Sequence, residues 1–87
     1  MILKGDKIIY STARKEYFEY ELLSKKTNTL TIETYCERIF GTYNYRLRTL
    51  LDYSFAIGKN QILGAHIQIS NLLVFDLKGN LIEKKKG

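Results

Sequence analysis

The sequence predicts a small, mainly β domain: a single antiparallel meander or partly open barrel of five to six strands, with at most one short helix. Two observations carry this prediction. Apolar and aromatic residues alternate with smaller or polar ones over 43–57 and again over 63–77, and segments with turn composition separate these runs from shorter ones. Side chains on a strand point alternately to opposite faces, so this pattern indicates strands with one buried face. An α+β fold is the alternative.

The first half of the chain is expected to hold a short strand and then a hairpin. The strand covers residues 7–10, and the hairpin joins 18–22 to 29–36 around the turn-forming segment 25–28. Its predicted core stripe is Phe18, Tyr20, Leu22, Leu30, Ile32, Thr34 and Cys36. Glu19 and Glu21 alternate with that stripe and are assigned to the solvated face.

Two segments also fit a helix. Ser11 or Thr12 could cap a helix through residue 18, because the following residues have fair helix propensity. Leu47, Leu50 and Leu51 follow helical as well as strand spacing. Both helices are kept as alternatives to the strand interpretation.

The second half is expected to form one long hairpin from 43–57 and 63–77. A three-residue loop at 59–61 would pair odd positions with odd positions, so that Tyr53 faces Ile67, Leu51 faces Ile69 and Thr49 faces Asn71. Tyr53 opposite His66 would contradict this register. Turn residues at 76–80 then lead into a short last strand at Leu81 and Ile82.

Length and charge further limit the class of protein that this sequence can encode. With 87 residues and a net charge of +5, we expect one domain over 1–83 and a basic tail over 84–87. No stretch is long and apolar enough for a membrane helix, and the first six residues lack the apolar region of a signal peptide. Cys36 is the single cysteine, which fits a reducing compartment. We therefore expect a cytoplasmic protein that does not bind membranes.

The residues available for catalysis are few. The chain has one histidine, one cysteine and six scattered glycines. It cannot supply the four Cys or His ligands of a structural metal site, and it has no glycine-rich phosphate loop. Cys36 falls on the predicted core face, where a cysteine commonly acts as a small apolar residue. We expect neither an enzyme nor a bound cofactor or metal.

Basic and aromatic residues are the candidate site. On a strand, Arg46 and Arg48 would project from one face about 7 Å apart, close to the spacing of neighbouring phosphates, with His66 across the hairpin. The alternative is a solvated polar face. Tyr17 and Tyr35 are expected to be exposed and to stack nucleic-acid bases. The cations expected to contribute with them are Lys25, Lys26 and Arg38.

Two binding functions follow. The first is a module that binds nucleic acid, or a complex containing it, through the basic strand face. The second is a protein-binding inhibitor or adaptor, of the kind found in phages and mobile elements, that acts through an edge strand or a tyrosine patch. Exposed edges in so small a sheet also predict a homodimer.

A third function comes from a partial resemblance. Residues 45–48 read Tyr-Arg-Leu-Arg and are followed by 52–57, a turn and an apolar strand through His66. This order resembles the sheet half of RelE-type ribosome-dependent toxins, over about a third of the chain. The resemblance implies Arg46, Arg48 and His66 as functional residues and two helices ahead of the sheet. Residues 28–37 predict a strand instead, and the short catalytic inventory ranks a toxin-like ribonuclease last.

Overall fold

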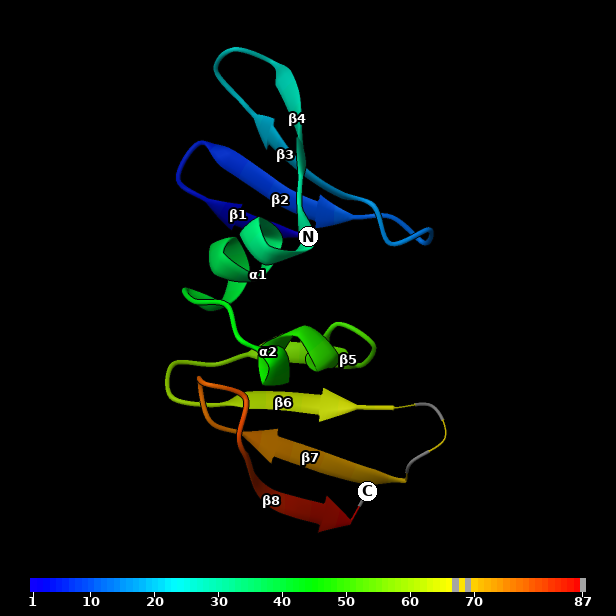
Figure 1. Ribbon diagram of the computed structural model, residues 1–87. Helices are drawn as coiled ribbons and strands as arrows, with labels where there is room; N and C mark the ends of the chain where they lie inside the picture. The colour runs from blue at the N-terminus through cyan, green and yellow to red at the C-terminus, as the bar shows by residue number, and fades with distance from the viewer. Residues whose placement is uncertain (67, 69, 87) are drawn as a thin grey trace. The chain divides into compact units, whose positions relative to one another are not determined.

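The computed structural model describes residues 1–66, 68 and 70–86, and it consists of two compact units, Met1–Gly41 and Thr42–Gly87. Each unit holds a four-stranded antiparallel sheet whose strands follow one another in sequence order (Figure 1). The predictions of a mainly β, antiparallel meander are confirmed. The described residues form eight strands in two open sheets and two helices. The predictions of five to six strands, of a partly open barrel and of at most one helix are therefore wrong.

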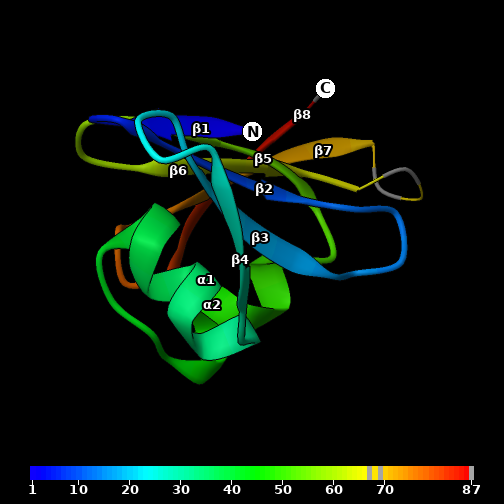
Figure 2. The same ribbon diagram turned by 90° about the horizontal axis from the view of Figure 1, so that it is seen from above.

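The first unit has four strands and one helix. In chain order these are β1 (Ile2–Lys4), β2 (Lys7–Ser11), β3 (Tyr17–Glu21), β4 (Lys26–Leu30) and α1 (Ile32–Phe40). Helix α1 lies on one face of the sheet, against β2, β3 and β4 (Figures 1 and 2). The strand predicted at 7–10 and a hairpin after it are confirmed, but the turn of that hairpin covers 22–25 rather than 25–28, and residues 26–28 belong to β4. The helix predicted from Thr12 is wrong, because Thr12 closes a turn by donating its backbone N–H to the Glu16 carbonyl at 2.9 Å.

The predicted strand over 29–36 is wrong beyond Leu30, since α1 begins at Ile32. Thr31 caps the helix, and its hydroxyl accepts a hydrogen bond from the Thr34 N–H at 3.2 Å. Gly41 ends the helix in the left-handed conformation, with φ of +86°. Tyr35, Cys36 and Ile39 are buried, at positions that share one side of a helix. Helical packing and both caps therefore prevail over the strand propensity of the threonines.

The predicted core stripe of the first unit lies on the wrong face of the sheet. Ile9 and Glu19 pair across β2 and β3, and both are buried on the face that carries α1. Phe18 and Tyr20 point the other way, because neighbouring strand residues alternate. They are half-buried, and no element of this unit covers them. Leu22, at the end of the stripe, is 43% exposed.

The second unit begins with a helix. Its elements are α2 (Tyr45–Leu50), β5 (Ser54–Ile57), β6 (Ile62–Ala65), β7 (Asn71–Phe75) and β8 (Leu81–Lys86). The prediction of a long strand over 43–57 is wrong for the residues before Ser54. The alternative helical spacing of Leu47 and Leu50 is confirmed, because both side chains are buried on α2. The run over 63–77 is not one strand either: it is divided between β6 and β7, which pair with each other.

The predicted register of the second hairpin is also wrong. Ser54 pairs with Ala65 and Ile57 with Ile62, so four residues form the loop. The Gly58 N–H donates to the Gln61 carbonyl at 2.8 Å and closes that loop. Tyr53 consequently lies beside His66, with ring centroids 5.5 Å apart. The pairings expected for Ile67 and Ile69 lie outside the described residues, and Thr49 is in α2, so it cannot face Asn71.

The C-terminal lysines belong to the sheet. The expected last strand is confirmed, and β8 extends beyond it through Lys84, Lys85 and Lys86, which pair with Leu73, Leu72 and Asn71. Three of the four residues expected as a basic tail are thus residues of an edge strand, and Gly87 lies outside the described residues. A single domain over 1–83 stays a prediction. Among the described residues, neither helix has the length and apolar character needed to cross a membrane.

Candidate nucleic-acid interface

Arg46 and Arg48 do not share a strand face. Both are exposed on α2, where residues two positions apart differ by about 200° around the helix axis. They therefore project to nearly opposite sides of the helix. The interface predicted from their strand spacing is wrong, because it depended on the period of two.

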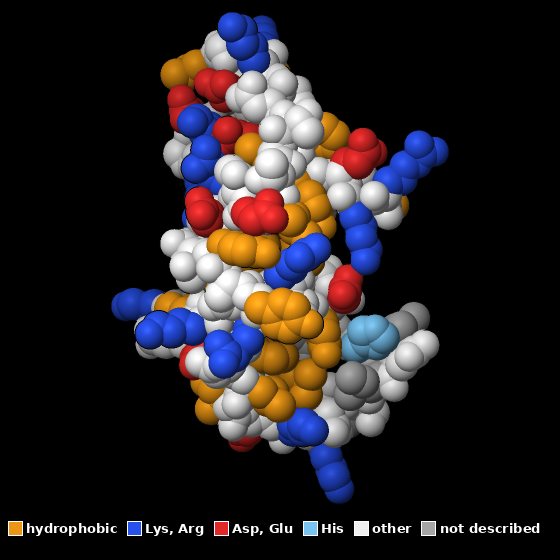
Figure 3. Space-filling model, viewed as in Figure 1, with side chains coloured by type: hydrophobic (Ala, Val, Ile, Leu, Met, Phe, Trp, Pro, Cys, Tyr) orange, Lys and Arg blue, Asp and Glu red, His pale blue; other side chains and the backbone are white. Residues whose placement is uncertain are grey.

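Arg46 instead joins a group of cations at one end of the second unit's sheet. The β5–β6 loop (58–61) and the β7–β8 turn (76–80) lie at this end, because β5 and β7 both finish there. We call it the turn end. Lys59 and Lys78 lie in these two segments. Figure 3 shows Lys and Arg side chains gathered beside these turns.

The β7–β8 turn holds the start of α2 at the turn end. The Asn44 side-chain amide donates to the Lys78 carbonyl at 2.8 Å, and its oxygen caps α2 by accepting from the Leu47 N–H at 2.8 Å. Gly79 packs so closely that a Cβ there would lie 2.9 Å from the Arg46 Cβ. Arg46, Lys59 and Lys78 are all exposed, and none forms an ion pair within the described part of the chain.

Asp76 organises that turn. Its carboxylate accepts hydrogen bonds from the backbone N–H groups of Lys78 and Asn80, each at 2.9 Å, and from the Asn80 side-chain amide at 3.0 Å. These donors, the Asn80 side chain first, favour the charged form and lower the pKa of Asp76 below its ordinary value of 3.8. The turn that presents Lys78 is thus held by an ionised carboxylate.

His66 lies away from the turn end. It comes directly after the last residue of β6, whereas the β5–β6 loop at the turn end comes directly before the first residue of β6. Arg46 and His66 are therefore separated by the length of that strand. The Nδ1 atom of His66 accepts from the Gln68 backbone N–H at 3.1 Å, and its ring meets the edge of Tyr53. The three residues implied by the toxin resemblance are not brought together.

The charge of the chain is concentrated in the second unit. Residues 42–87 contain seven Lys or Arg against three Asp or Glu, a net charge of +4. Residues 1–41 contain seven against six, a net charge of +1. An excess of this size on 46 residues attracts polyanions.

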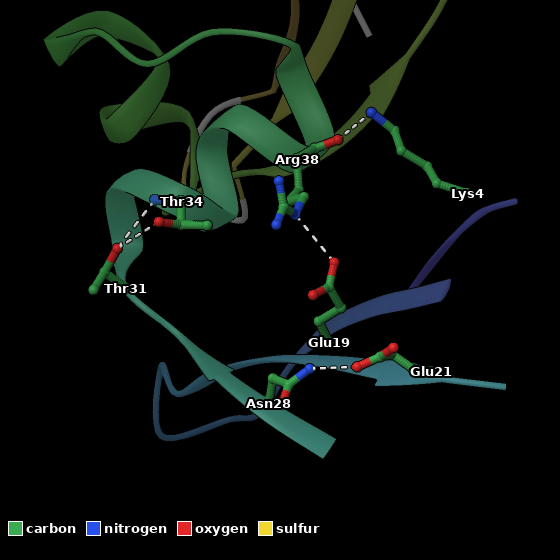
Figure 4. A network of polar contacts seen from close by, with 7 residues as sticks. All are labelled: Lys4, Glu19, Glu21, Asn28, Thr31, Thr34 and Arg38. Carbon is green, nitrogen blue, oxygen red and sulfur yellow. Dashed lines mark hydrogen bonds and ion pairs between the residues drawn. The ribbon is translucent and has the colours of Figure 1, made fainter. Parts of the chain in front are cut away.

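In the first unit, Arg38 forms an internal ion pair. Its Nε donates to the Glu19 carboxylate at 3.0 Å, and Glu19 is only 4% exposed (Figure 4). The Lys4 ammonium donates to the Arg38 carbonyl on the same side of the sheet. Arg38 thus neutralises a buried carboxylate and fixes α1 to β3, which is a structural role.

Tyr17 and Tyr35 lie together, with ring centroids 4.4 Å apart. The exposed position expected for Tyr35 is wrong, since the side chain is buried on α1 and is 7% exposed. Lys25 and Lys26 are exposed, in the β3–β4 turn and at the start of β4. Lys25 adopts the left-handed conformation, with φ of +59°, that this turn requires.

The structure exposes an aromatic surface that sequence reasoning assigned to the core. We call it the aromatic face, and it consists of Leu3, Ile8, Tyr10, Phe18 and Tyr20, on the side of the sheet opposite α1. An open groove of about 400 Å³ lies along part of it, lined by Met1, Ile8, Tyr10, Ser11 and Tyr20. The cap at Thr31 and the glycine at 41 are the sequence signals that would have placed α1 and thereby the covered face.

The described residues contain no group of three or more His, Cys, Asp or Glu side chains able to hold a metal ion. Helices α1 and α2 do precede the β5–β8 sheet, so the strand predicted at 28–37 is no argument against the toxin resemblance. Comparison with protein-family models, curated proteins and solved structures finds no match for the chain.

Proposed function

We propose that the chain is a non-enzymatic module that binds nucleic acid chiefly through the cations of residues 42–87. The observation that carries this proposal is the net charge of +4 in that unit, with Arg46, Lys59 and Lys78 exposed at its turn end. Phosphate contacts of this kind release counterions, so they contribute to affinity for any nucleic acid and weaken as salt rises.

The test is a salt titration of binding to labelled single-stranded DNA, duplex DNA and RNA. The variant Arg46→Gln, Lys59→Gln, Lys78→Gln should bind more weakly than the wild type. If each residue contacts one phosphate of a single strand, the slope of log affinity against log salt should fall by about 2. Glutamine keeps the Cβ atom of Arg46 that packs near Gly79, so the fold should persist.

The matched control preserves charge at the same positions: Arg46→Lys, Lys59→Arg and Lys78→Arg. It should bind with wild-type affinity and slope. Failure of the wild type to bind any of the three nucleic acids at about 50 mM salt would contradict the proposal. Equal binding by the glutamine variant and the wild type would remove the turn end from the interface.

A protein-binding inhibitor or adaptor is the second candidate, favoured by the uncovered aromatic face. Two of the four edge strands are poorly suited to pairing with a partner, since β8 carries three consecutive lysines and β1 has only three residues. Short or lysine-rich edges hinder the addition of another strand. A protein partner would therefore use the aromatic face or the edges at β4 and β5.

A further inference from the structure

We infer that the aromatic face binds single-stranded nucleic acid by stacking its bases on Tyr10, Phe18 and Tyr20. This inference rests on the proposed function and adds the kind of nucleic acid that the chain selects. Its starting point is that the first unit covers only one side of its sheet, with α1, and leaves aromatic rings on the other.

The rings form a continuous surface. Tyr10 and Phe18 are paired across β2 and β3, and their rings stack with centroids 5.4 Å apart. Tyr20 follows Phe18 on the same face of β3, about 7 Å further along the strand. Bases stack on aromatic side chains in a largely sequence-independent way, because every base has a flat π face. The face therefore offers neighbouring stacking positions.

Hydroxyl groups border these rings. Thr27 pairs with Tyr20 and Thr29 with Phe18, which places both threonines on the same face, where they are exposed. Their hydroxyls can donate or accept hydrogen bonds from base edges and from phosphate oxygens. The strand residues of the face carry no charge, so the bases are not opposed by a carboxylate.

Cations lie at both ends of the aromatic face. The β2–β3 turn contains Arg14 and Lys15 against Glu16. The β3–β4 turn at the opposite end contains Lys25, whereas Lys4, Lys7 and Lys26 alternate onto the side of the sheet that carries α1. The β2–β3 end thus has an excess of positive charge beside an uncharged aromatic centre. This pattern complements a chain that carries phosphates along its whole length and flat rings between them.

Such a ligand is a single strand rather than a duplex or a protein. In a duplex the bases are stacked on one another and reach a protein only by their edges in the grooves, so their faces cannot lie on a sheet. A protein patch that matched the apolar centre would also need a carboxylate opposite the β2–β3 turn.

The test compares rings with aliphatic side chains. Tyr10→Leu combined with Tyr20→Leu keeps apolar side chains on the face but removes two stacking rings, whereas Tyr10→Phe combined with Tyr20→Phe keeps the rings. Binding is measured with a dT oligonucleotide, a uridine oligonucleotide and a duplex, each about 12 nucleotides long, within the site size of small single-strand binders. Circular dichroism of each variant checks that the fold is retained.

We expect the leucine variant to bind both single strands at least 10-fold more weakly and the duplex unchanged, and the phenylalanine variant to match the wild type. Unchanged single-strand binding by a folded leucine variant would overturn the inference and leave the proposed function standing. A wild type that binds none of the oligonucleotides would overturn both. A protein that binds the wild type but not the leucine variant, with single-strand affinity unaffected, would reassign the face to protein recognition and overturn the inference.

Discussion

At the scale of single residues, Gly79 is the position with the strictest requirement. Its φ of +91° is in the left-handed region, and an added Cβ would lie 3.0 Å from the Leu47 backbone nitrogen. Gly79→Ala should lower the free energy of unfolding by about 2–4 kcal/mol, from backbone strain and overpacking together. Urea unfolding measures this change.

Gly41→Ala is the matched control for that variant. Gly41 has a similar φ of +86°, but nothing lies within 4 Å of the position of its Cβ. Only backbone strain applies there, so we expect a loss of about 1–2 kcal/mol. If the two variants were equally destabilised, the close packing of the β7–β8 turn on α2 would contribute nothing.

The carboxyl group of Asp76 predicts a pH dependence. Hydrogen bonds, above all from the Asn80 side chain, lower its pKa in the folded state below the ordinary value of 3.8. The ionised group then stabilises the fold fully above that ordinary value, and this stabilisation is lost as the pH falls through the lower, folded pKa. We expect the stability difference between the wild type and Asp76→Asn to shrink over that acidic range, as followed by urea unfolding at several pH values. A difference that stayed constant down to the lowest pH would contradict this assignment.

At the scale of elements, the Glu19–Arg38 pair joins β3 to α1. Arg38→Gln leaves the buried Glu19 carboxylate without its cation, and we expect a loss of about 2 kcal/mol in the free energy of unfolding. This is less than a fully buried pair would lose, because the Arg38 side chain is 44% exposed and water screens it. Adding Glu19→Gln removes the uncompensated charge.

The double variant tests whether the two side chains act together. Arg38→Gln combined with Glu19→Gln should be more stable than Arg38→Gln alone, by thermal or urea unfolding. Purely additive losses would show that the buried carboxylate does not depend on Arg38.

Strand β8 predicts a difference between removing its lysines and removing their charges. Deletion of residues 84–87 leaves Asn71, Leu72 and Leu73 without their partners in the ladder. We expect this deletion to cost about 2–3 kcal/mol of unfolding free energy, from several lost backbone hydrogen bonds. Lys84→Gln, Lys85→Gln and Lys86→Gln together keep the backbone and should change stability by less than about 0.5 kcal/mol. Equal stability of the deletion variant and the wild type would mean that these pairs contribute nothing.

At the scale of the whole molecule, the uneven charge predicts two kinds of binding. Neutralising Arg46, Lys59 and Lys78 with glutamine removes three charges from the unit with net +4, and it should weaken duplex and single-strand binding alike. Neutralising Arg14 and Lys25 removes two charges at the ends of the aromatic face. That second variant should weaken single-strand binding more than duplex binding, as measured by parallel salt titrations. The opposite order would contradict the division of roles between the two units.

The sequence by itself determined much of the local structure of the first unit. Strand alternation located β2 and β3, although the β3–β4 turn lies three residues before the turn-forming segment that predicted it. The composition also determined the basic character and the short catalytic inventory. These features depend on residues close together in the chain, where backbone preferences and periodicity act directly.

Alternation alone could not show which face of the first sheet is covered. It shows that the two faces of a strand differ, and by itself it predicts Phe18 and Tyr20 for the core. Glu19 is buried instead, because Arg38, 19 residues later in the chain, supplies its counter-charge from α1. Of the residues predicted for the nucleic-acid interface, Arg46 and Lys25 remain exposed cations at the proposed surfaces, whereas Arg38 and Tyr35 serve packing.

Only the tertiary structure decided the start of the second unit. The alternation over 43–57 predicted a strand, yet Leu47 and Leu50 bury one side of α2, and the β7–β8 turn fixes its beginning through Asn44 and Gly79. The spacing of these leucines fits both a helix and a strand, so packing decides which of the two forms. The turn that α2 packs against lies about 30 residues later in the chain. Local pattern therefore set the propensity for strand and turn, while long-range packing set the helices, the register and the exposed faces.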